Sequence, residues 1–134
     1  MEQESFATKQ KYFKGKTIEE LKLLDTREFA KFLKSRPRRA IMRNFNFVEA
    51  FIKKANSKVS KNKQIKTQKR DIIIVPALVG MTISVHNGKE FFPIKIVEEM
   101  LGHRLGEFSM TRKKVQHGAP GIGATKSSSA MSVK

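Results

Sequence analysis

The sequence predicts an α+β fold, in which a small three-stranded antiparallel sheet packs against N-terminal helices and one short helix. Three observations predict it. Asn87-Gly88 lies between two runs in which apolar residues alternate, and Asn-Gly favours a two-residue hairpin turn with positive φ at both positions. Residues 72–75 form an unbroken β-branched run that predicts a buried third strand. Apolar residues recur at helical spacing between residues 17 and 55.

The predicted turn also fixes a register for the hairpin. It pairs Ile83 with Phe92 and Thr82 with Pro93, and it places one apolar set on a single face of the sheet. That set is Met81, Ile83, Val85, Phe92 and Ile94. Pro93 then stands where the ladder needs an N–H donor, so we expect a bulge, a broken ladder or an edge strand there.

Helix start signals precede the sheet. Thr17, followed three residues later by Glu20, predicts a capping box. Asp25 or Thr26 is expected to cap a second helix, and residues 35–37 predict a third start, because proline is tolerated in a first turn. Residues 47–55 predict a further amphipathic helix, and residues 97–102 a short one with acids in its first turn.

These signals divide the chain into five parts. They are an N-terminal extension (1–14), a helical region (15–57), a basic linker (58–71), a sheet core with its short helix (72–112) and a C-terminal arm (113–134). The arm is rich in glycine and serine and has no helix or strand period, so we expect flexible, basic extensions at both ends.

The charge balance points to a polyanionic partner. The chain carries 28 Lys and Arg against 12 Asp and Glu, for a formal net charge of +16. Such an excess destabilises a compact monomer and favours binding to nucleic acid or an anionic surface. No apolar run approaches the roughly 20 residues that span a bilayer, the polar start is unlike a signal peptide, and the absence of cysteine excludes disulfides.

The strongest charge cluster is Arg36, Arg38, Arg39 and Arg43. In a helix, Arg36, Arg39 and Arg43 share one face, and no acid lies between Glu28 and Glu49 to pair with them. The alternatives are a solvated helix face and bidentate phosphate contacts, and the missing acids favour phosphate.

Catalytic and metal chemistry find little support. Residues 118–127 resemble a phosphate-binding loop, but the order of Lys126 and the flanking residues departs from the nucleotide-hydrolase pattern. The three histidines, His86, His103 and His117, lie far apart and have no cysteine partners. We therefore expect no enzyme activity, no cofactor and no metal, while His103 remains either a helix C-terminal cap or an RNA contact.

Several motifs in fixed order resemble one known family. They are Ile-Val-Pro at 74–76, Val-His-Asn-Gly-Lys at 85–89, Glu-Met-Leu-Gly-His at 99–103, Leu-Gly-Glu-Phe at 105–108 and Thr-Arg at 111–112. Together they look like the small-subunit ribosomal protein nineteen family, called fifteen in eukaryotes. Ser-Arg-Pro-Arg-Arg at 35–39 and Pro-Gly-Ile-Gly-Ala-Thr at 120–125 resemble its archaeal and eukaryotic branch.

The resemblance implies a non-enzymatic constituent of the small-subunit head in the cytosolic ribosome. It implies binding to small-subunit rRNA, with ribosomal proteins thirteen and fourteen as neighbours and A- and P-site tRNA as candidate partners of the arm. Neither a membrane nor self-association is expected. The alternatives are a generic basic module for nucleic acid or anionic surfaces and, behind it, an enzyme with a phosphate-binding loop.

Charge and resemblance together give two sets of candidate residues. The expected rRNA-binding residues are Arg36, Arg38, Arg39, Arg43, Lys66, Lys69, Arg70, Lys89, His103, Arg104, Arg112, Lys113 and Lys114. The residues expected in the arm toward the decoding region and tRNA are His117, Gly118, Gly121, Gly123, Thr125, Lys126 and Ser127.

Overall fold

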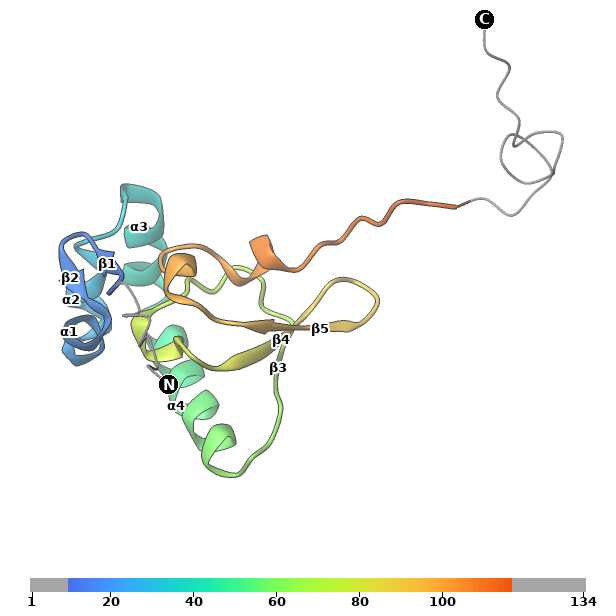
Figure 1. The fold of residues 1–134 in the computed structure, drawn as a ribbon, viewed down its shortest axis with the longest axis horizontal. Coiled ribbons are helices and arrows are strands. Elements are labelled where there is room, and N and C mark those ends of the chain that lie inside the picture. The colour runs from blue at the N-terminus through green and yellow to red at the C-terminus, as the bar shows by residue number, and fades with distance from the viewer. Residues whose placement is uncertain (1–9, 117–134) are drawn as a thin grey trace, which may run out of the picture.

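A computed structural model describes residues 10–116 and confirms the α+β class (Figure 1). A two-stranded ribbon, β1 (Tyr12–Phe13) and β2 (Lys16–Thr17), precedes the helices α1 (Ile18–Leu23), α2 (Thr26–Ala30), α3 (Ser35–Arg43) and α4 (Phe45–Ser60). The strands β3 (Ile65–Thr67), β4 (Thr82–His86) and β5 (Phe91–Lys95) follow. Short 3₁₀ helices are η1 (Pro76–Leu78), η2 (Glu98–Met100) and η3 (Leu105–Phe108).

The third strand of the sheet differs from the predicted one. The strand order is β3-β4-β5; β4 and β5 form the expected antiparallel hairpin, but β3 runs parallel to β4. This strand lies inside the stretch predicted to be a linker, and α4 extends to Ser60 at the start of that stretch. A parallel pair needs a crossover of about a dozen residues, and the chain between residues 67 and 82 supplies it.

The apolar run at residues 72–75 is buried, as predicted, but it lies outside this sheet. Its backbone bonds instead to the segment after η2. The N–H of Ile74 donates to the carbonyl of His103 at 2.8 Å, and the N–H of Leu105 donates to the carbonyl of Ile72 at 3.0 Å. The run therefore holds residues 102–105 against the core, and it does not form the third strand of the sheet.

The hairpin register also differs from the predicted one. Ile83 pairs with Ile94 and Ser84 with Pro93, and the N–H of Asn87 donates to the carbonyl of Glu90. Gly88 takes the positive φ, +101°, whereas Asn87 does not, because its side-chain oxygen accepts the N–H groups of Lys89 and Glu90.

This register removes the conflict at Pro93. Bonded and non-bonded pairs alternate along an antiparallel ladder. Counting from the bonded Asn87–Glu90 pair, Pro93 falls in a non-bonded pair, where its nitrogen faces away from β4. The predicted edge position is confirmed, since β5 ends the sheet. The predicted face assignment also survives, except that Phe92 is 49% exposed and does not enter the core.

The first three helices begin close to their predicted start signals, although only α1 has a side-chain capping hydrogen bond. Thr17 accepts the N–H of Glu20, and the Glu20 carboxylate accepts the N–H of Thr17, which confirms the capping box. Asp25 precedes α2, and Pro37 lies in the first turn of α3. Phe29, Ile41 and Val48 bring α2, α3 and α4 into the same core as Ile83 and Val85 of β4.

Candidate nucleic-acid interface

Most of the positive charge in residues 10–116 has no acidic partner among those residues. In residues 10–116 the ion pairs are Lys11 with Glu99, at 2.7 Å, and His103 with Glu107, at 2.8 Å. Every Arg and every other Lys in that range lacks an acidic oxygen of those same residues within 4.0 Å. The excess charge is therefore left for an external anion.

The exposed Lys11–Glu99 pair shows what a partner does to these groups. The side-chain hydrogen bond, supported by charge attraction, raises the pKa of Lys11 and lowers the pKa of Glu99. The pair links the chain just before β1 to η2, two segments that are far apart in the sequence.

The arginine cluster on α3 divides into two kinds of residue. Arg36, Arg39 and Arg43 are exposed and make no side-chain hydrogen bond to any other described residue. Arg38 bonds instead to carbonyls at the end of α2 and just after it. Its guanidinium donates to the backbone oxygens of Ala30, Lys31 and Leu33, at 3.3, 2.9 and 3.3 Å. A cation at a helix C-terminus also complements the helix dipole.

Arg70 also donates to three backbone carbonyls, and its hydrogen bonds are shorter than those of Arg38. Nη1 donates to the carbonyl of His86 at 2.6 Å, and Nη2 donates to the carbonyls of Gly106 and Ser109 at 2.7 and 2.6 Å. One side chain thus ties β4 to η3 and to the start of the C-terminal segment. The geometry gives Arg70 a structural role that its place in a basic stretch did not predict.

Gly106 permits this arrangement. A Cβ at that position would lie 2.9 Å from the Cβ of Arg70 and 3.0 Å from its carbonyl oxygen. The two backbones therefore approach more closely than any side chain at residue 106 would allow. The motif Leu-Gly-Glu-Phe is the sequence signal that could have located this contact, but its partner lies 36 residues earlier.

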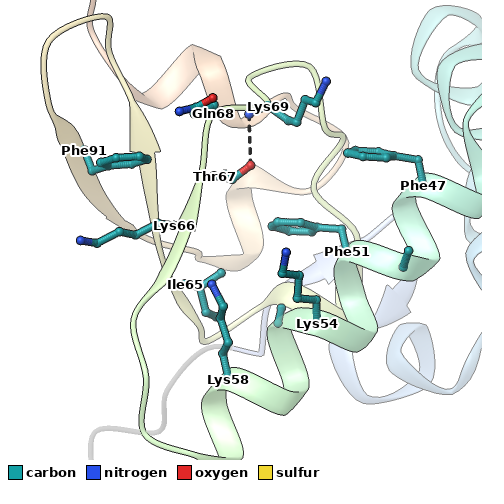
Figure 2. A pocket seen from close by; sticks show the side chains of 12 residues that line it. Phe47, Phe51, Lys54, Lys58, Ile65, Lys66, Thr67, Gln68, Lys69 and Phe91 are labelled. Atoms are coloured by element: carbon teal, nitrogen blue, oxygen red, sulfur yellow. Dashed lines mark hydrogen bonds between the residues drawn. The ribbon is translucent and has the colours of Figure 1, made fainter.

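The remaining candidate cations lie in three places. Lys66 and Lys69 flank a hollow between α4 and β3 (Figure 2). Lys89 is exposed in the loop of the β4–β5 hairpin. Arg112, Lys113 and Lys114 are exposed on an extended segment that runs away from the body of the molecule (Figure 1).

His103 and Arg104 lie at the turn before η3. The His103 ring bonds to the Glu107 carboxylate and packs edge-on against Phe108, with centroids 6.0 Å apart. The N–H of Arg104 donates to the same carboxylate, at 3.3 Å. Glu107 thus holds both residues at the start of η3, and its negative charge lies beside the imidazole.

Some predictions fall outside the described part of the chain, namely those on His117, Gly118, Gly121, Gly123, Thr125, Lys126 and Ser127. Among residues 10–116, no group of three or more His, Asp or Glu side chains is placed to hold a metal ion. Over the same residues, no helix has the length and apolar character needed to cross a membrane.

A comparison with protein-family models gives a match to the family described as ribosomal protein S19, over residues 34–117. The match starts at the residue before α3 and covers α4, the sheet and the extended segment. The chain belongs to the ribosomal protein S19 family. It is a small-subunit ribosomal protein that binds rRNA and takes part in translation as a component of a ribonucleoprotein. The unpaired cations described above are the surface that such a protein needs.

Proposed function

We propose that this S19-family protein is a structural, non-catalytic part of the small-subunit head and that it binds rRNA through three basic surfaces. The first is the α3 face, made by Arg36, Arg39 and Arg43. The second is formed by Lys66 and Lys69 beside β3. The third is the extended segment with Arg112, Lys113 and Lys114. Lys89, His103 and Arg104 are secondary candidates at the hairpin loop and before η3.

The observation that supports the proposal is the absence of acidic partners for the α3 face. Three arginines on successive turns, with no acid within 4.0 Å among residues 10–116, gain little from folding. A guanidinium pairs with phosphate in bidentate geometry, and each neutralised phosphate releases counterions. An RNA backbone is therefore the ligand that fits this face.

We further propose that residues 113–134 form an arm toward the decoding region and the A- and P-site tRNAs. Ribosomal proteins thirteen and fourteen are the proposed neighbours, and the cytosolic ribosome is the proposed location. The family membership and the outward course of residues 110–116 support this part of the proposal (Figure 1).

The test of the rRNA interface is a filter-binding titration against salt with a small-subunit rRNA fragment. The variant carries Arg36→Gln, Arg39→Gln and Arg43→Gln together. Because each phosphate contact contributes roughly 0.7–0.9 to the slope of log K against log salt, we expect the slope to fall by about 2–3.

A matched control keeps the change in net charge but moves it elsewhere. It carries Lys22→Gln, Lys53→Gln and Lys95→Gln, exposed residues outside the proposed interface. The control should retain most of the slope. Equal losses in both triple variants would mean that the α3 face has no special role, and tighter binding to anionic vesicles or duplex DNA than to rRNA would favour a generic basic module.

The arm is tested by deleting residues 119–134. We expect co-sedimentation with small subunits to persist, because the proposed rRNA-binding residues are retained, and tRNA-dependent steps of translation to weaken. Loss of co-sedimentation in the deleted protein would instead give the arm an assembly role.

A further inference from the structure

The hollow between α4 and β3 combines features that the α3 face lacks. It has a volume of about 510 Å³ and is lined by aromatic rings as well as lysines. Phe47 and Phe51 come from α4 on one side and Phe91 comes from β5 on the other, with β3 between them (Figure 2). This volume lies in the range of about 300–1,000 Å³ that is typical of ligand sites.

The aromatic rings in this hollow are accessible. Phe47 is 44% exposed and Phe91 is 37% exposed, although both are large apolar side chains in a small protein. The Phe91 ring is held by an edge-on contact with His86, with centroids 4.9 Å apart. An exposed ring in a fixed orientation can accept a flat partner without losing further rotamer freedom.

Lysines surround these rings, and no acid lines the hollow. Lys66 Nζ lies 5.6 Å from the Phe91 centroid, and Lys69 Nζ lies 5.8 Å from the Phe47 centroid. Lys54 and Lys58 line the side of the hollow that α4 forms (Figure 2). An occupant must therefore be anionic at its margins and flat and apolar at its centre.

Unpaired nucleotides meet both requirements. A base stacks on an aromatic ring through its π-face, while its phosphates pair with lysines. Gln68 also lines the hollow, and its exposed amide can both donate to and accept from a base edge. A duplex backbone alone would give Phe47 and Phe91 nothing to contact.

We infer that the hollow binds a single-stranded stretch of the RNA, with bases stacked on Phe47 and Phe91 and phosphates on Lys54, Lys58 and Lys66. The inference rests on the proposed rRNA-binding function and adds to it a site that takes unstacked bases. The α3 face would then contact backbone only, and the hollow would distinguish unpaired from paired RNA.

The test compares two short RNAs of equal charge, a uridine hexamer and an abasic hexamer, in fluorescence-anisotropy titrations at low salt. The variants are Phe47→Leu and Phe91→Leu, which keep an apolar side chain but remove the ring. Stacking on an aromatic ring is worth roughly 5- to 100-fold in affinity per base. Each variant should therefore bind the uridine hexamer at least roughly 5-fold more weakly than the unmodified chain does. Its affinity for the abasic hexamer should not change.

Phe92→Leu is the matched control. Phe92 is adjacent to Phe91 and 49% exposed, but it lies on the opposite face of β5 and does not line the hollow. It should bind both hexamers as the unmodified chain does. If Phe47→Leu and Phe91→Leu keep the full preference for uridine, the inference is wrong, and the hollow is left for another occupant such as an acidic protein segment.

The two proposals fail in different ways. If the hollow does not bind bases, either the two hexamers bind equally or the preference for uridine persists in both phenylalanine variants, and salt still weakens the binding of both hexamers. If the chain does not bind RNA, neither hexamer binds. If circular dichroism shows that a variant has lost its fold, a second experiment takes the place of that variant. In this experiment the unmodified protein is photocrosslinked to RNA that carries 5-iodouridine. Crosslinks at Phe47 or Phe91 support the inference, and crosslinks confined to α3 or residues 110–116 overturn it.

Discussion

Two groups of arginines, alike in sequence, have opposite roles in this molecule. Arg70 and Arg38 direct their guanidinium groups at backbone carbonyls, and each makes three hydrogen bonds to them. Arg36, Arg39 and Arg43 project from α3 without any side-chain hydrogen bond among the described residues. The first group holds the fold together, and the second is free for an external anion.

The comparison shows that net charge overstates the surface available to RNA. A guanidinium has five N–H donors in a rigid fork. Once three are committed to carbonyls, the group has little freedom to follow a phosphate backbone. Arg70 is additionally half-buried, so it contributes positive potential at the surface but few direct contacts.

The largest effect should come from Arg70→Met. This change removes three hydrogen bonds that a charged donor makes, and it leaves three carbonyls to find water in a half-buried site. Hydrogen bonds to charged groups contribute about 1.5–3 kcal/mol each and are not additive. We expect the free energy of unfolding to fall by about 3–5 kcal/mol in urea denaturation without RNA.

Arg39→Met is the control for that experiment, since it removes the same charge from an exposed position. Its free energy of unfolding should change by less than about 0.5 kcal/mol. Equal destabilisation by the two changes would remove the distinction between the groups. Arg70→Lys should be destabilising as well, because an ammonium cannot reproduce the fork.

Gly106→Ala tests the same contact from the opposite side. Its Cβ would meet the Cβ of Arg70 at 2.9 Å and the carbonyl oxygen at 3.0 Å. Overpacking of this kind costs about 1–3 kcal/mol. In a double-mutant cycle with Arg70→Met, the two losses should be less than additive, because both disrupt one contact. Full additivity would show that Gly106 acts independently of Arg70.

Arg38→Met should have a smaller effect. Its hydrogen bonds are longer, at 2.9–3.3 Å, and the side chain is exposed. Losing the cation that caps α2 should lower the free energy of unfolding by about 0.5–1.5 kcal/mol. Arg36→Met, from the same helix, is the control and should leave stability unchanged. A stable Arg38→Met protein with weakened RNA binding would move Arg38 into the interface group.

The same contrast explains which parts of the fold could be predicted. The capping box at Thr17 and Glu20 is local, and both residues are visible in one turn of sequence. The faces of the hairpin follow from alternation, which is also local. The register does not, because the Asn87 side-chain oxygen accepts two N–H groups, and Gly88 has a positive φ whereas Asn87 does not.

The features that the sequence did not predict depend on residues that are far apart in the chain. The third strand has only Ile65 and Thr67 as buried positions in a lysine-rich stretch, so the longer run at residues 72–75 offered a stronger signal. The role of Arg70 depends on Gly106 and Ser109, which lie 36 and 39 residues later. The hollow depends on Phe47 and Phe91 approaching β3 from different elements, and no local motif joins them.

The smallest predicted effect concerns the one lysine among residues 10–116 that does have an acidic partner. Lys11→Gln removes the hydrogen bond to Glu99, so the pKa of the Glu99 carboxyl should rise toward its usual value. Because the folded state lowers that pKa, the pair stabilises the protein above the unfolded pKa of the carboxyl, and this contribution is lost as pH falls through the folded pKa. Carboxyl NMR titrations of both proteins measure the shift. An identical titration of Glu99 in the two proteins would mean that the contact does not persist in solution. Lys11 would then lack an acidic partner in solution, as the exposed α3 arginines do among residues 10–116.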